Sequence, residues 1–109
     1  MNAKYEMTYL AGGDDIFGPN FGGAEVFTNT RKGYVEECPN VGKLLTNLTF
    51  TLAMENEIMS AILEGGEEPL AAATAWLKSN PGILGGWLAG VTTLGGDDGL
   101  AAVQASLGL

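Results

Sequence analysis

The sequence predicts an α+β fold in which two N-terminal strands precede four or five short helices. Apolar and polar residues alternate in the first third of the chain, whereas apolar residues recur every three or four positions after Pro39. Glycine and proline separate these segments. Two strands alone form a poor sheet, so a fold with this content lacks partners for its strands.

The two predicted strands occupy residues 4–10 and 24–34. In the first, three apolar residues alternate with polar ones: Tyr5, Met7 and Tyr9. The second alternates through Val26, or through Glu25 and Phe27, and is rich in residues that favour strands. The sequence between them, AGGDDIFGPNFGG, carries five glycines and a proline and indicates turns.

The first two helices are predicted on either side of residue 50. One begins at Pro39, which suits a first helical position, and its apolar side holds Val41, Leu44, Leu45 and Leu48. The other covers about residues 51–64 and ends at Gly65-Gly66. Its apolar face holds Met54, Ile58, Ala61 and Ile62.

Three more helices follow. The third begins at Pro69 after two glutamates, which complement the positive end of a helix, and its apolar stripe is Leu70, Ala73, Trp76 and Leu77. The fourth opens at Asn80-Pro81, runs through Ile83, Leu84, Trp87 and Leu88, and ends at Gly90. The last covers residues 100–107, with Asp97 or Asp98 as its cap and Gly108 after it.

The composition excludes several classes of function. The chain of 109 residues has thirteen acidic and five basic residues, a net charge of −8 and a pI near 4.1, which argue against a nucleic-acid partner. It has no histidine, the commonest general base and zinc ligand, and its one cysteine cannot form an internal disulfide. We therefore expect no catalytic residues, no metal site and no cofactor.

The segment RKGYVEECPNVGKLL, residues 31–45, is the first candidate for chemistry. Three basic residues near Cys38 could favour its thiolate: Arg31, Lys32 and Lys43. Glu36 and Glu37 oppose that effect, and no histidine is present to act as a base. Gly42-Lys43 resembles the end of a phosphate loop, but Leu44 follows it where the motif needs serine or threonine. A structural cysteine and a solvated lysine are favoured.

Two further motifs also have structural explanations. GGDD occurs at 12–15 and 95–98, but each copy supplies only two adjacent carboxylates, too few for calcium, whereas aspartates that precede a helix cap it. A small enzyme that uses Cys38 or these aspartates is a disfavoured hypothesis, because the chain has no histidine to act as a base. The glycosylation sequon Asn47-Leu48-Thr49 falls in a predicted helix, so we discount it.

Aromatic residues could in principle form a cage around a quaternary ammonium group. The candidates are Trp76, Trp87, Tyr5, Tyr9 and Tyr34. Both tryptophans belong to apolar helix faces, so we favour packing in the core over ligand binding.

Three stretches carry a resemblance to a known family: TRKGYVEECPNVGKLLTNLTFTLAMENEIM, AAATAWLKSNPGILGGWLAGVTT and GLAAVQASLGL. They resemble the carboxy-terminal third of the glycine betaine/choline/proline-betaine substrate-binding proteins of ABC transporters. The opening MNAKYEMTYL is similar to the segment that follows the Trp-x-Pro-His-Trp strand of that family. The resemblance implies a fragment of a two-lobed type II periplasmic binding protein.

The resemblance also implies an arrangement of lobes. Residues 1–23 would belong to the second lobe, residues 24–34 would be a crossing strand and hinge, and residues 35–109 would pack as helices on the first lobe. The orphan strands would then pair with strands upstream. The aromatic residues of the family's ligand cage lie mainly upstream as well, so no ligand-binding residue is carried over to this chain.

The function implied by the resemblance is substrate binding for an ABC importer. The partners would be a quaternary ammonium ligand such as glycine betaine or choline, and a transporter permease. The family is periplasmic, but the N-terminus lacks the pattern of a secretory signal, so we expect the chain as written to stay in the cytoplasm. The alternative is a structural fragment that binds no ligand and forms homo-oligomers through its exposed strands.

Overall fold

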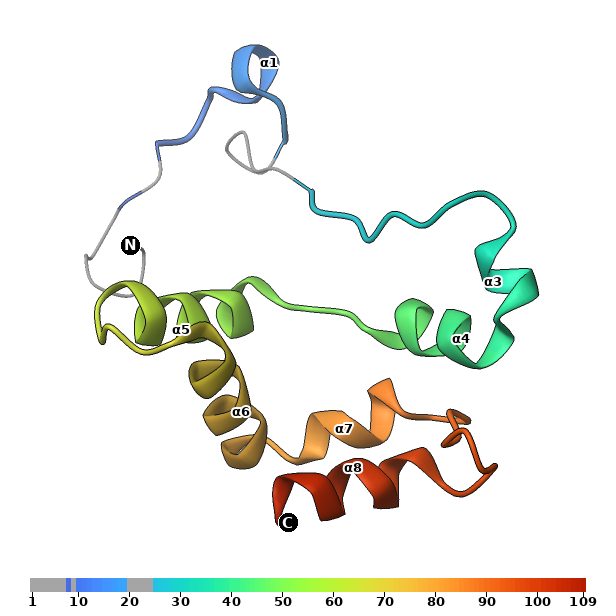
Figure 1. Ribbon diagram of the computed structural model, residues 1–109. Coiled ribbons are helices and arrows are strands. Elements are labelled where there is room, and N and C mark those ends of the chain that lie inside the picture. The colour runs from blue at the N-terminus through green and yellow to red at the C-terminus, as the bar shows by residue number, and fades with distance from the viewer. Residues whose placement is uncertain (1–7, 9, 20–24) are drawn as a thin grey trace.

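The computed structural model describes residue 8, residues 10–19 and residues 25–109. In these segments the chain forms seven helices and no β-strand, with one isolated antiparallel bridge between Thr92 and Asp98. The helices, shown in Figure 1, are α1 (Asp14–Phe17), α3 (Tyr34–Glu37), α4 (Pro39–Asn47), α5 (Leu52–Leu63), α6 (Pro69–Ser79), α7 (Gly82–Trp87) and α8 (Gly99–Leu107).

The predicted α+β class is therefore wrong for the described part of the chain. Residues 25–30 form an extended connection without strand pairing, in which Val26 is 84% and Phe27 is 70% exposed. The predicted strand at 4–10 lies mainly outside the described residues, and Thr8 and Leu10 within it are not in a strand. A strand is stable only when its backbone groups pair with a neighbour, and alternation of side chains does not supply that neighbour.

The helices after residue 38 lie where their spacing placed them. Thr51 caps α5 by accepting a hydrogen bond from the backbone N–H of Met54 (3.3 Å). Between the two aspartates proposed as caps of the last helix, Asp98 has this role, since its Oδ1 accepts from the N–H of Ala101 (2.8 Å). Gly108 ends α8 in the left-handed conformation that glycine adopts without strain.

Two short helices, α1 and α3, were not predicted. The first GGDD sequence precedes α1, whose first turn contains Asp14 and Asp15. Helix α3 begins after Gly33, whose positive φ of 81° reverses the chain direction. The predicted strand 24–34 therefore ends in a turn and the start of a helix.

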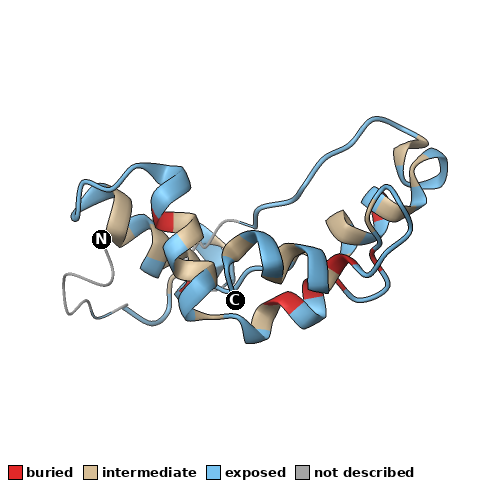
Figure 2. Cartoon of the chain, turned by 60° about the horizontal axis from the view of Figure 1, so that its bottom comes forward, coloured by how far each residue is buried: buried red, intermediate tan, exposed pale blue. Residues whose placement is uncertain are grey.

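The largest cluster of buried residues lies in the C-terminal half. Leu84, Leu88 and Val91 are buried there, and partly buried residues of α4, α6, α7 and α8 pack around them: Leu44, Leu77, Ile83, Leu100, Val103 and Leu107. Figure 2 shows how few residues of the chain are buried. The radius of gyration is 17.5 Å, whereas a compact chain of this length would have about 13 Å. The fold is therefore open.

Helices α5 and α6 form a separate hairpin (Figure 1). Met54 of α5 and Ala72 of α6 are buried in it, and the indole Nε1 of Trp76 donates to Glu57 Oε2 across the hairpin (2.7 Å). Leu70 was predicted to belong to the apolar stripe of α6 but is 80% exposed. The buried face of α6 turns toward α5 around Ala72, and Leu70 lies away from it.

Candidate functional site

The basic residues of the segment 31–45 have structural partners. The two terminal guanidinium nitrogens of Arg31 donate to the carboxylate of Glu37, Nη1 at 3.0 Å, and the guanidinium lies 5.5 Å from the centre of the Tyr34 ring. The hydrogen bond from Arg31 lowers the pKa of Glu37 below its ordinary value. This exposed pair closes the turn at Gly33.

Cys38 lies at the junction between α3 and α4, where it is half-buried. Arg31, one of the three basic residues considered as activators of its thiol, is engaged by Glu37. The arrangement supports the structural interpretation of Cys38 over a nucleophile, because no histidine is available to activate it.

The Gly42-Lys43 pair serves helix packing. A Cβ atom at Gly42 would lie 2.8 Å from Val35 Cγ1 and 2.9 Å from Val35 Cα, so only glycine lets α4 approach α3 this closely. Gly42 is buried inside α4, and Lys43 is exposed on the same helix. A phosphate loop would instead present its glycine backbone to the ligand.

The described aromatic candidates have different partners and do not form one cage. Trp76 bonds to Glu57 in the α5–α6 hairpin, and Tyr34 lies beside Arg31. Trp87 is buried at 8% exposure, packs against Phe50 with ring centroids 5.0 Å apart, and donates from Nε1 to the carbonyl of Thr49 (3.2 Å). Core packing is confirmed for Trp87, whereas Trp76 is only half-buried. Tyr5 and Tyr9 lie outside the described residues.

The sequon asparagine also has a structural role. The side-chain amide of Asn47 donates to the carbonyls of Trp87 and Ala89, both at 3.1 Å. These bonds fix the end of α4 against the end of α7. An amide held in this way is poorly placed to accept a glycan.

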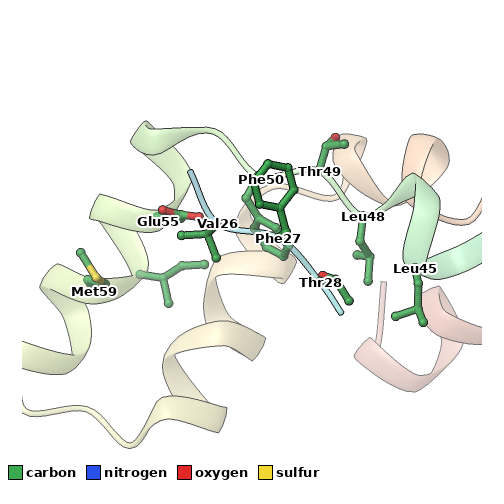
Figure 3. Close-up of a pocket in the computed structure, with 10 residues that line it drawn as sticks. Val26, Phe27, Thr28, Leu45, Leu48, Thr49, Phe50, Glu55 and Met59 are labelled. Carbon is green, nitrogen blue, oxygen red and sulfur yellow. The ribbon is translucent and has the colours of Figure 1, made fainter. Parts of the chain in front are cut away.

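The described residues form an apolar groove of about 710 Å³, which we call the crossing groove. It forms where residues 26–28 pass the junction between α4 and α5, and its walls are Val26, Phe27, Thr28, Leu45, Leu48, Thr49, Phe50, Glu55, Ile58 and Met59. Figure 3 shows Phe27 and Phe50 at its centre, Glu55 and Met59 on the α5 side, and Leu45 and Leu48 on the α4 side.

The chemistry of the crossing groove is mainly aliphatic. Glu55 contributes the one carboxylate among its lining residues, and the two aromatic rings belong to phenylalanines. Sequence reasoning missed this groove. Its signals were the exposed pair Val26-Phe27 and the apolar segment LTF at 48–50 between two helices, but neither shows which segments lie side by side.

In the described segments, no cluster of three or more acidic or cysteine residues is arranged to hold a metal ion. None of the helices found there has the length and apolar character needed to cross a membrane.

Comparison with known proteins identifies the class to which this fold belongs. Residues 1–79 match the family described as the substrate binding domain of ABC-type glycine betaine transport systems. The match covers most of the chain, and the chain belongs to this family.

Solved structures and a curated relative agree with that family. The chain is 64% identical to an ABC-transporter choline binding protein solved in complex with choline, with a TM-score of 0.85 over 98% of this chain and 37% of that one. The unliganded semi-closed form of an ABC-transporter choline binding protein gives a TM-score of 0.78 at the same identity, over 100% of this chain and 38% of that one. The glycine betaine/carnitine transport binding protein GbuC of Listeria monocytogenes is 29% identical over 98 residues, which are 90% of this chain and 31% of the relative.

The chain thus spans about a third of the length of these relatives. The resemblance stated from sequence is confirmed at the level of the family. The solved relatives are longer than this chain, and the rest of each relative has no counterpart among these 109 residues.

Proposed function

We propose that this chain is the C-terminal part of the substrate-binding component of an ABC importer for quaternary ammonium compounds such as choline or glycine betaine. The observation that carries the proposal is the 64% identity, over nearly the whole chain, to a protein solved with choline bound. The associated partner would be the permease of the importer, in the periplasm, and the role would be binding and not catalysis.

The proposed arrangement follows from the family fold. Residues 1–23 would belong to the second lobe, residues 24–34 would connect the lobes as a hinge, and residues 35–109 would pack on the first lobe. The extended connection 25–30 and the turn at Gly33 support a linking role for the middle segment.

The proposed ligand cage lies mainly outside these 109 residues. This position of the cage is supported by the described aromatic candidates, each of which has another partner. Trp76 bonds to Glu57, Trp87 packs on Phe50, and Tyr34 lies beside Arg31. The chain alone would then bind choline weakly or not at all.

A chimera tests the proposed function. The matching part of the choline-binding relative would be replaced by this chain, and choline binding would be measured by calorimetry. We expect an affinity within about tenfold of the relative, or about 1.4 kcal/mol. A folded chimera that binds no choline would contradict the proposal, and micromolar binding by the 109-residue chain alone would contradict the position of the cage.

A second candidate function is self-association of the chain as a structural fragment. The observation in its favour is the amount of exposed apolar surface on an open fold. Sedimentation over a range of concentrations tests it, and a mass that stays monomeric throughout would count against it.

A further inference from the structure

We propose that Met54 is a redox-sensitive cap of helix α5, and that oxidation of its sulfur to the sulfoxide loosens the α5–α6 hairpin. The proposal is independent of the proposed function, because it uses only contacts between residues of this chain. It assigns a modification site, a class of oxidant and a structural consequence that can be measured.

The sulfur of Met54 takes part in a reciprocal cap at the start of α5. The backbone N–H of Met54 donates to Thr51 Oγ1 (3.3 Å), and the backbone N–H of Thr51 donates to Met54 Sδ (3.4 Å). In the usual form of this capping box, the second acceptor is the side-chain oxygen of a glutamate or glutamine. A thioether is a weaker acceptor, and unlike those oxygens it can be oxidised.

The same side chain belongs to the core of the hairpin. Met54 is 9% exposed, and Met54 and Ala72 are the buried residues of α5 and α6. Because the hairpin buries so few residues, a change at Met54 affects much of its apolar core. Met59 lies on the same helix but is 43% exposed, and it therefore provides an internal comparison.

The modification is a two-electron oxygen transfer from a peroxide. A lone pair of the Met54 sulfur attacks one oxygen of hydrogen peroxide, an S–O bond forms, and the O–O bond breaks. The departing hydroxide takes the proton of the new S–OH group and becomes water, so the sulfur is oxidised and the peroxide is reduced. The sulfur becomes accessible when the first turn of α5 opens, since helix ends fray more readily than packed helices unfold.

An added oxygen disturbs the hairpin on either side of the sulfur. On the side of Thr51, an N–H···O hydrogen bond takes about 2.9 Å, which leaves only about 0.5 Å of the 3.4 Å between Thr51 N and Met54 Sδ for an S–O bond along this line. The side chain must then withdraw, and the cap changes. On the other side, the oxygen enters the apolar interior of the hairpin as a polar group, which is costly. We therefore expect both sulfoxide epimers to loosen the hairpin.

Peroxide treatment of two variants tests the proposal. Met59→Leu keeps Met54, whereas Met54→Leu removes it, and both substitutions nearly conserve volume. Met1 and Met7 are present in both variants, so their oxidation is common to both. Mass spectrometry would map the sulfoxides, and circular dichroism would follow thermal melts. We expect the melting temperature to fall by about 5 °C or more for Met59→Leu, and by less than about 2 °C for Met54→Leu.

Two further measurements separate the cap from general damage. Methionine sulfoxide reductases for both epimers should restore the melting temperature of treated Met59→Leu, because this oxidation is reversible. Hydrogen exchange should locate the change, with backbone amides of α5 and α6 losing more protection than those of α8. Met54→Gln offers an amide oxygen to the N–H of Thr51 in place of the sulfur, and its melting temperature should respond to peroxide no more than that of Met54→Leu.

Four results would overturn the proposal. In the unmodified chain, Met54 stays unmodified under conditions that fully oxidise Met59. Met54 is oxidised without a fall in the melting temperature. Treated Met54→Leu loses as much as treated Met59→Leu. The loss of amide protection is as large in α8 as in α5 and α6.

Discussion

The side chain of Asn40 pairs with the backbone of Thr92 as another peptide group would. Its Nδ2 donates to the Thr92 carbonyl (2.7 Å), and its Oδ1 accepts from the Thr92 N–H (2.9 Å). Asn47 lies seven residues further along α4, on the same face, and donates to Trp87 and Ala89. Two asparagines two turns apart thus join α4 to the segment that runs from α7 to the Thr92 loop.

Replacement of Asn40 by alanine should lower the free energy of unfolding by about 1–3 kcal/mol, because both backbone groups of Thr92 lose their partner. Chemical denaturation followed by circular dichroism measures this loss. Asn29→Ala is the matched control, since its amide bonds only to the carbonyl of Phe27 two residues away, and its cost should stay within about 0.5 kcal/mol. Equal costs for the two variants would argue against the role of the Asn40 pair.

Replacement of Gly42 by alanine should be among the most damaging small changes in the chain. The new Cβ would lie 2.8 Å from Val35 Cγ1 and 2.9 Å from Val35 Cα, so α3 and α4 must separate. We expect a loss of about 1–3 kcal/mol in the free energy of unfolding.

Gly85→Ala provides the control for that substitution. Gly85 lies inside α7, and a Cβ there would meet no atom within 4 Å. Alanine should therefore stabilise the chain by about 0.5–1 kcal/mol through its higher helix propensity. A destabilising Gly85→Ala together with a neutral Gly42→Ala would contradict this account of the packing.

The helices could be predicted because their signals are local. The prolines at the start of α4 and α6, the cap at Asp98 and Gly108 at the end of α8 all act within a few residues of the chain. Helix α3 was missed because it is a single turn that begins after Gly33, at the end of a segment whose alternation predicted a strand up to residue 34.

The strands and the site depended on contacts that the sequence does not encode locally. The alternation around Val26 and Phe27 predicted a strand, but a strand needs a paired neighbour and none is present in the described residues. The crossing groove joins residues 26–28 to residues 45–59, and no local pattern brings these together.

Asp98 and Asp97 should differ in their effect on stability although they are adjacent. Asp98→Ala removes the acceptor of the Ala101 N–H at the start of α8 and should cost about 1 kcal/mol in the free energy of unfolding. Asp97→Ala should cost less, because the hydrogen bonds between Asp97 and Thr93 use the backbone N–H and carbonyl of Asp97, which alanine retains. Thermal melts of both variants measure the difference, and a larger loss for Asp97→Ala would reverse the assignment of the cap.

The ion pair between Arg31 and Glu37 should be visible in the titration of Glu37. The hydrogen bond from Arg31 lowers the pKa of Glu37 in the folded chain, so the contribution of the pair is present above the unfolded-state pKa and is lost as the pH falls through the folded-state pKa. Both side chains are exposed, so the pKa is a more sensitive readout than stability.

Carboxyl carbon chemical shifts followed by NMR between neutral and acidic pH should place the Glu37 midpoint below the ordinary glutamate value of about 4.3. Arg31→Gln should return that midpoint toward the ordinary value, whereas Lys32→Gln, which leaves the hydrogen bond intact, should move it less. A Glu37 midpoint that is the same with and without Arg31 would mean that the turn at Gly33 holds without the pair, and that the backbone alone sets the direction in which the chain enters α3.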